Sequence, residues 1–283
     1  MSAEYHEPRA WDEAVATLQE HGDDALVLAG GTAYTLLLRQ GLIRPGHVIG
    51  LRRLPGAARI DADAHGGVSI GAMATHTQAL RSEAVREHWP ELGAALAKVA
   101  TIRIRNQATV GGSVAHADPA SDAPVMLCAL GAQAVVVSGS ERRRAPVDEL
   151  FVDTFTTSLA PHELIHSVEI PGRTPWTRAA YLKYTLRSVD DYATVSVAVR
   201  AEITDGVVEE LRVFLGGVGA TPMRATSTER ALRGRRVEPR ALGDAAALAR
   251  NDVDPADDVR GSAAYKREMT RVFTERALRS VLA

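Results

Sequence analysis

The stretch Ile104-Arg105-Asn106-Gln107-Ala108-Thr109-Val110-Gly111-Gly112-Ser113 decides how this sequence is read. Its paired glycines lack a Cβ and accept positive φ, so successive backbone N–H groups can point at one anion. Thr109 and Ser113 add neutral hydroxyl groups, and the turn contains no lysine. This combination suits a diphosphate bridge held by backbone amides better than a phosphate awaiting transfer.

A second glycine turn, Leu28-Ala29-Gly30-Gly31-Thr32-Ala33, stands nearer the N-terminus. Residues 25–29 before it are predicted to form a short buried strand, and residues 34–40 after it a helix that Thr32 caps. The positive end of the helix dipole would then face an anion at the turn. We expect a branched side chain at Gly30 or Gly111 to abolish retention of the diphosphate ligand, and the chain need not unfold.

A plainer interpretation of the two turns stays open. A single Gly-Gly pair is usually only a turn, and neither stretch matches Gly-x-Gly-x-x-Gly or the P-loop pattern. Two such turns, each beside a strand, favour a shared ligand without establishing one.

Length and composition limit the class of protein. The chain has 283 residues, 46% of them hydrophobic, which predicts two or three packed lobes. A net charge of −2 gives no general attraction to nucleic acid or to an anionic membrane. The N-terminus has no apolar signal core and no stretch is long enough to span a bilayer, so we expect a cytoplasmic protein. The arginines 142–144 are expected in a solvated turn.

The single cysteine, Cys128, excludes an internal disulfide and a cysteine-ligated zinc or iron–sulfur centre within this chain. It lies in an apolar run and is expected to be buried. His116 and Asp118 have no third ligand near them in sequence, so no metal site is expected. Asp122 is expected to cap the next helix, and the charges around Lys183 are expected at a solvated strand edge.

These residues in this order resemble the medium, FAD-binding subunits of the molybdenum hydroxylases, the family of carbon monoxide dehydrogenase and bacterial xanthine dehydrogenase. The run from Ile104 to Ser113 is the most specific match. The similarity extends over nearly the whole chain through Ala29–Thr32, His116–Asp122, Lys183–Ala193, Gly216–Arg224 and Ala264–Lys266.

The resemblance implies an α+β fold: a two-lobed FAD-binding unit of the vanillyl-alcohol-oxidase and cell-wall-reductase type, followed by a C-terminal α+β domain of a sheet plus helices. The expected boundaries are residues 1–54 for the first lobe, a β-α-β unit, 55–173 for the second lobe and 177–283 for the C-terminal flavoprotein domain.

The resemblance also implies that both turns bracket the FAD diphosphate. The first cradle comprises Val27, Leu28, Ala29, Gly30, Gly31, Thr32, Ala33 and Tyr34. The second cradle comprises Thr109, Val110, Gly111, Gly112 and Ser113. Further FAD contacts fall on Val99, Asp122, Ile165 and Lys183, and Tyr192 is the candidate that lines the isoalloxazine. Ala33 replaces a commoner Ser or Asp, and Ser113 a commoner Asn.

The implied function is electron transfer. A molybdenum cofactor on a large subunit would hydroxylate the substrate, and [2Fe-2S] clusters on a small subunit would pass electrons to FAD on this chain. NAD, a quinone or oxygen would be the final acceptor, and no residue here need act as acid or base. Two alternatives stay open: a stand-alone FAD-dependent oxidase and a non-catalytic nucleotide-binding scaffold. A scaffold would be colourless.

Overall fold

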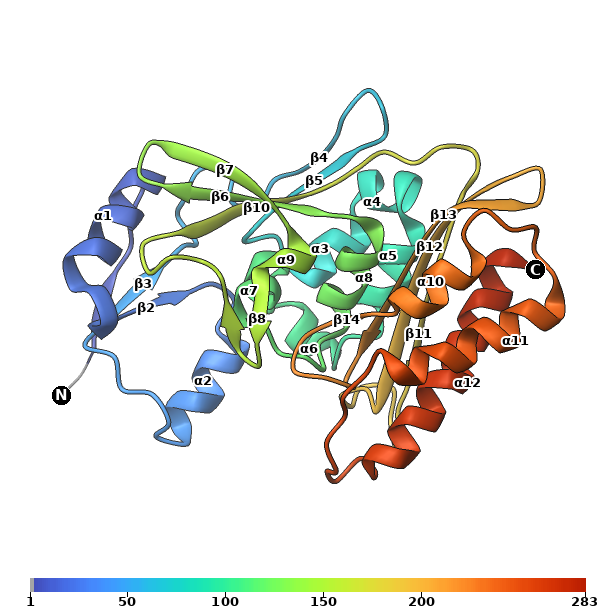
Figure 1. The fold of residues 1–283 in the computed structure, drawn as a ribbon. Helices are drawn as coiled ribbons and strands as arrows, with labels where there is room; N and C mark the ends of the chain where they lie inside the picture. Colours follow the sequence, from blue (N-terminus) through green and yellow to red (C-terminus); the bar gives the residue numbers. More distant parts are fainter. Residues whose placement is uncertain (1–2) are drawn as a thin grey trace.

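A computed structural model describes residues 3–283 as three consecutive α/β units arranged side by side (Figure 1). The strands form a three-stranded, a five-stranded and a four-stranded sheet, with a small two-stranded hairpin besides. The fold is the α+β architecture expected from the sequence, with the FAD-binding part first and a separate sheet-and-helix unit after it.

The first unit is a parallel sheet in the order β1-β3-β2. Its elements in chain order are β1 (Glu4–His6), α1 (Trp11–His21), a 3-10 turn (Gly22–Asp24), β2 (Ala25–Leu28), α2 (Thr32–Arg39) and β3 (His47–Gly50). The helix α1 buries Ala14, Val15 and Leu18 in a small core that also contains Ile49. Strand β1 was not expected, because Glu4-Tyr5-His6 has no apolar alternation and is held by its pairing with β3.

The second unit is an antiparallel sheet in the order β4-β5-β10-β6-β7. Its strands are β4 (Ile60–Ala62), β5 (Val68–Gly71), β6 (Gln133–Ser138), β7 (Glu141–Pro146) and β10 (Leu164–Ile170), with the hairpin β8 (Phe151–Asp153) and β9 (Thr156–Thr157). Its helices are α3 (His76–Arg81), α4 (Glu83–His88), α5 (Pro90–Leu96), α6 (Ile102–Arg105), α7 (Val110–His116), α8 (Asp122–Leu130) and α9 (Val147–Leu150). The helix α8 is buried along its whole length, including Cys128, whose thiol pKa is raised by burial.

The arginine cluster 142–144 lies in strand β7, so the expected turn was wrong, whereas the expected exposure to solvent was right. Its pairing with β6 runs from Gln133 to Ser138. Arg143 and Arg144 reach across β6 to β10, where they bind Glu163, just before that strand, at 2.6 Å and Glu169 at 2.7 Å. Cross-strand charge pairs of this kind let a highly charged segment serve as an edge strand.

The third unit is an antiparallel sheet covered by helices. Its elements are β11 (Thr177–Tyr184), β12 (Val195–Thr204), β13 (Val207–Gly216), β14 (Met223–Arg224), α10 (Thr226–Leu232), α11 (Pro239–Leu248), a 3-10 turn (Ala249–Asn251) and α12 (Ala263–Leu282). Alternate residues of β12 bury opposite faces of the sheet. Val197 and Val199 join the core under α12, whereas Ala198 joins the core shared with α8. The C-terminal sheet is therefore packed on both sides, as Figure 1 shows.

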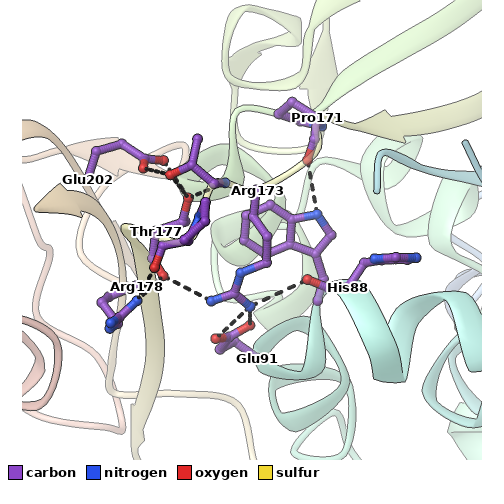
Figure 2. A network of polar contacts seen from close by, with 10 residues as sticks. His88, Glu91, Pro171, Arg173, Thr177, Arg178 and Glu202 are labelled. Atoms are coloured by element: carbon purple, nitrogen blue, oxygen red, sulfur yellow. Dashed lines mark hydrogen bonds and ion pairs between the residues drawn. The ribbon is translucent and has the colours of Figure 1, made fainter. Parts of the chain in front are cut away.

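The segment 171–175, whose sequence Pro-Gly-Arg-Thr-Pro is typical of a linker, is held by hydrogen bonds to both neighbouring units (Figure 2). The Arg173 guanidinium donates to the Glu91 carboxylate at 3.1 Å and to the Thr177 carbonyl at 3.0 Å. The Trp89 indole N–H donates to the Pro171 carbonyl at 3.0 Å. These contacts tie α5 and the end of α4 to the first strand of the C-terminal sheet.

Across residues 3–283, no helix has both the length and the hydropathy required to cross a membrane.

Candidate functional site

The two glycine turns, distant in sequence, lie against each other. A Cβ on Gly30 would overlap the carbonyl oxygen of Gln107. A Cβ on Gly112 would lie 3.3 Å from the Cβ of Ala29. The structure thus brings both predicted cradles together, as a shared ligand requires.

The first turn ends in an uncapped helix. Gly31, with φ of 72°, is the N-cap of α2, so Thr32 is the first helical residue and not the cap that the sequence suggested. The Gly31 carbonyl accepts from Thr35 N at 2.9 Å. Because glycine has no side chain to cap the helix, the N–H groups of the first turn are left for another acceptor. All residues from 27 to 34 are partly exposed.

The second turn is bound to the core of its lobe. Val110 N donates to Ala74 O at 2.9 Å, and Gly111 N donates to Ala72 O at 3.0 Å. A Cβ on Gly111 would lie 2.5 Å from the Cβ of Ala72. Gly111 is therefore required for packing, and a branched side chain there would disturb the fold, contrary to the expectation from sequence. Gly30 is likewise constrained by the backbone of Gln107.

The hydroxyls of the second turn already have partners within the chain. Thr109 caps α7, because its Oγ1 accepts from Gly112 N at 3.1 Å. Ser113 Oγ lies 3.0 Å from Thr109 O and 2.9 Å from Nε2 of His76. His76 is 1% exposed, and burial lowers its pKa to about 4. The neutral imidazole of His76 thus holds Ser113 of the second turn by a hydrogen bond inside the lobe.

The Arg-Asn pair that precedes the second turn has a positioning role. The Arg105 guanidinium donates to Val99 O at 2.7 Å and to Ala100 O at 2.5 Å. Asn106 Oδ1 accepts from the Thr77 hydroxyl at 2.6 Å. The Arg105 bonds tie the backbone at Val99, one of the predicted FAD contacts, to the segment that precedes the second turn.

Asp122 and Lys183 form a buried ion pair between α8 and β11. Lys183 Nζ donates to Asp122 Oδ2 at 2.9 Å and to Lys98 O at 2.8 Å. The Tyr181 hydroxyl donates to Asp122 Oδ1 at 2.5 Å. The Lys183 side chain is 2% exposed, so the expected solvated strand edge was wrong for this residue. Asp122 is also not the helix cap, which is Ser121.

Electrostatics in this pair follow from burial. Removal from water raises the pKa of Asp122 although Lys183 opposes the rise. Burial also lowers the pKa of the neighbouring Lys98, whose Nζ donates to Tyr181 O at 3.1 Å. Val99, Asp122 and Lys183, three of the four predicted FAD contacts outside the turns, are thereby connected through Lys98.

Tyr192 lies half-exposed on the loop after β11, with the Arg260 guanidinium 5.4 Å from its ring centre. Partial burial and the Asp118 carboxylate raise the pKa of Tyr192 to about 12. The C-terminal unit therefore reaches the segment that follows the second turn. The fourth predicted contact, Ile165 on β10, is packed in the lobe core opposite Val136.

His116 and Asp118 each contact a different part of their own lobe. The His116 ring packs 5.0 Å from the Phe155 ring, while Asp118 Oδ1 accepts from Ala120 N at 2.9 Å. Both residues have structural partners of their own.

Comparison with known proteins identifies the two parts of the chain. Residues 1–173 match the family described as the FAD binding domain in molybdopterin dehydrogenase. Residues 180–281 match the CO dehydrogenase flavoprotein C-terminal domain.

Whole-length relatives agree. The chain is 32% identical to the carbon monoxide dehydrogenase medium chain of Hydrogenophaga pseudoflava, over 99% of this chain and 97% of that one. It is 33% identical to the 6-hydroxypseudooxynicotine dehydrogenase complex subunit alpha of Paenarthrobacter nicotinovorans, over 97% and 95%. A solved structure of the Hydrogenophaga pseudoflava enzyme superposes with a TM-score of 0.95 at 34% identity, covering 99% and 97%. The chain therefore belongs to the FAD-binding subunits of molybdenum-hydroxylase-type dehydrogenases, and is an oxidoreductase subunit of that family.

Proposed function

We propose that this chain holds one FAD between its two glycine turns and serves as the electron outlet of a three-part dehydrogenase. A small subunit with [2Fe-2S] clusters and a large subunit with a molybdenum cofactor would supply the electrons. NAD or another acceptor would receive them.

The observation that carries the proposal is the contact between the turns. The first turn offers the N–H groups of α2, which no side chain caps. The second turn lies so close to it that a Cβ on Gly112 would stand 3.3 Å from the Cβ of Ala29. A diphosphate needs free backbone donors and little side-chain bulk around it. The first turn meets this requirement, because Gly31 has no capping side chain and leaves the first N–H groups of α2 free. The N–H groups of residues 110–113 already donate within the chain, so the second turn would contribute a close backbone surface without side-chain bulk.

Each part of the chain has a distinct task in this proposal. Residues 27–34 and 109–113 bind the diphosphate, the first through the helix start and the second through a rigid backbone. Val99, Ile165, Asp122 and Lys183 are proposed as further FAD contacts, with the buried ion pair fixing the C-terminal sheet against α8. Tyr192, held near Arg260, is proposed to line the isoalloxazine.

Bound FAD can exchange electrons singly or in pairs, which suits a link between one-electron and two-electron carriers. The chain itself contributes position, local charge and shielding. Its sequence contains one cysteine, which is buried in α8 and is too few to ligate a cluster that needs four thiolates. The clusters must therefore stand on another subunit, and partner surface on this chain is required.

The test compares the chain alone with the chain expressed beside its genomic neighbours. Both samples are assayed for hydroxylation of purines, aldehydes and N-heterocycles and for oxidation of carbon monoxide. Flavin content is measured in each sample. We expect FAD in both samples and turnover only in the assembled complex. Substrate oxidation by the isolated, metal-free chain would overturn the proposal and favour a stand-alone oxidase. A colourless chain that accepts no FAD would favour a nucleotide-binding scaffold.

A further inference from the structure

Three histidines from separate segments meet on the first lobe. His6 ends β1, His21 ends α1 and His47 begins β3. One ring nitrogen from each lies within 4.8 Å of the others, and all three residues are partly buried. Sequence spacing gave no hint of this cluster, because its members are separated by a helix and by a β-α-β connection.

The contacts within the cluster are close for three groups of the same kind. His6 Nε2 lies 3.0 Å from His47 Nδ1. The rings of His21 and His47 stack with centres 3.6 Å apart and planes 7° apart. His6 packs against both, with ring centres 5.2 Å away in each case. Two neutral imidazoles can share one N–H, but three converging rings leave nitrogen lone pairs that a cation would satisfy.

We propose that His6, His21 and His47 form a binding site for one divalent transition-metal ion of the zinc class. Neutral imidazole nitrogen is a preferred ligand of zinc, nickel and copper ions. Two nitrogens that each bind one zinc ion at about 2.0–2.1 Å stand roughly 3.3 Å apart at a tetrahedral angle. The observed 3.0 Å between His6 and His47 is close to that separation.

Ligation needs a limited rearrangement of the third ring. His21 turns out of its stack on His47 to aim a nitrogen at the same point. As the last residue of α1, followed by Gly22 with φ of 50°, it can move without disturbing the buried face of the helix. Glu4, whose Oε2 lies 3.8 Å from His47 Nδ1, would supply the fourth ligand, or a water molecule would take that place.

The site is separate from the flavin turns. Strand pairing places Ala25 opposite His47 and Leu28 opposite Gly50, so His47 lies at the end of the sheet away from the first glycine turn. Three strand steps separate these ends by about 10 Å. The metal would tie β1, α1 and β3 together and stabilise the first lobe by binding only its folded form.

The experiment uses the full, untagged chain with FAD bound. After incubation with Zn²⁺ and dialysis, bound zinc is counted per chain and thermal unfolding is recorded with and without the metal. Substitution by Co²⁺ adds a spectroscopic signature, since tetrahedral Co²⁺ absorbs at longer wavelengths than flavin. The variants are His6→Gln, His21→Gln and His47→Gln, with the exposed His65→Gln as matched control.

We expect one zinc per chain, a melting temperature raised by zinc and a tetrahedral Co²⁺ spectrum, all retained in His65→Gln. Each cluster variant should weaken binding by about tenfold or more while keeping its FAD. Absence of stoichiometric zinc and of the Co²⁺ signature in the wild-type chain overturns the proposal, even if a variant fails to fold. Equal zinc binding by the wild type and the cluster variants also overturns it.

Discussion

The two glycine turns have similar sequences and opposite surroundings. The first, around Gly30 and Gly31, is partly exposed and leads into a helix without a side-chain cap. The second, around Gly111 and Gly112, is the first turn of α7, is capped by Thr109, and is tied to Ala72 and Ala74. The chain then continues to the buried Asp122–Lys183 pair. Gly30 and Gly111 both allow two segments of protein to pack closely. The two turns differ at the helix start, because Gly31 leaves the N–H groups of α2 without a side-chain cap whereas Thr109 caps α7.

We call the second turn, with His76 behind it and the Asp122–Lys183 pair, the anchored region. The contrast predicts that changes in the anchored region lower the free energy of unfolding, whereas a change at Gly31 lowers the affinity for flavin. Each variant below is therefore measured for both the free energy of unfolding without flavin and the affinity for FAD.

The largest effect is expected from Lys183→Met. Removal of the ammonium leaves the Asp122 carboxylate buried without its cation, which should lower the free energy of unfolding by about 3–5 kcal/mol. Denaturant unfolding of the flavin-free chain measures it. The double variant Asp122→Asn, Lys183→Met should recover much of the loss, and Glu169→Gln at the exposed Arg144 pair should change stability little. A Lys183→Met chain as stable as wild type would show that the Asp122–Lys183 pair does not stabilise the fold.

Gly111→Ala should be the next most damaging change. Its Cβ would stand 2.5 Å from the Cβ of Ala72, so overpacking should cost about 1–3 kcal/mol or more. The matched control is Gly93→Ala in α5, where the new Cβ meets nothing closer than 3.7 Å. Equal unfolding free energies for the two variants would show that the second turn is not packed as described.

Acid should lower the free energy of unfolding by protonating the buried His76, which supports the second turn. Its pKa is near 4 when folded and about 6.5 when unfolded, so the unfolded chain binds more protons between these values. The stability that the neutral His76 contributes is fully present above pH 6.5 and is lost as the pH falls. At pH 5 the free energy of unfolding should be lower by about 2 kcal/mol. The pH dependence of unfolding should flatten in His76→Gln but not in His65→Gln. If the free energy of unfolding of His76→Gln fell with pH as steeply as that of the wild type, another group would be responsible for the acid sensitivity.

The smallest effect on stability, and the clearest on flavin, is expected from Gly31→Ala. Alanine at φ of 72° costs about 1–2 kcal/mol, and relaxation of that strain would turn the N–H groups of α2 away. We expect FAD affinity to fall about tenfold or more. Gly41→Ala, after the other end of α2 and with φ of 70°, carries the same strain without the turn. Equal FAD affinity in these two variants would mean that the first turn holds no diphosphate.

Much of the fold could be predicted because its patterns are local. The strand at residues 207–216 and the helices near the C-terminus follow from apolar periodicity, and the glycine turns from their composition. Strands β1 and β7 could not be predicted, since Glu4-Tyr5-His6 and Glu141–Pro146 are polar and gain their structure from neighbouring strands and ion pairs.

The site shows the same division. The sequence and its family resemblance proposed the turns, Asp122, Lys183 and Tyr192 as FAD contacts, but did not reveal what the protein packs around them. The burial of Lys183 depends on β11 packing beside α8, and the need for Gly111 depends on Ala72, about forty residues earlier. Long-range contacts of this kind, like the three histidines of the first lobe, leave no spacing for sequence analysis to detect.

The central claim, that the two turns together hold one FAD, is tested most directly by the flavin the chain releases. The purified full-length chain is reconstituted with an equal mixture of FAD and FMN, dialysed, denatured and chromatographed. The account predicts about one FAD per chain and no FMN, because a dinucleotide diphosphate is what the two turns are built to hold. Recovery of FMN, or of no flavin at all, would contradict it.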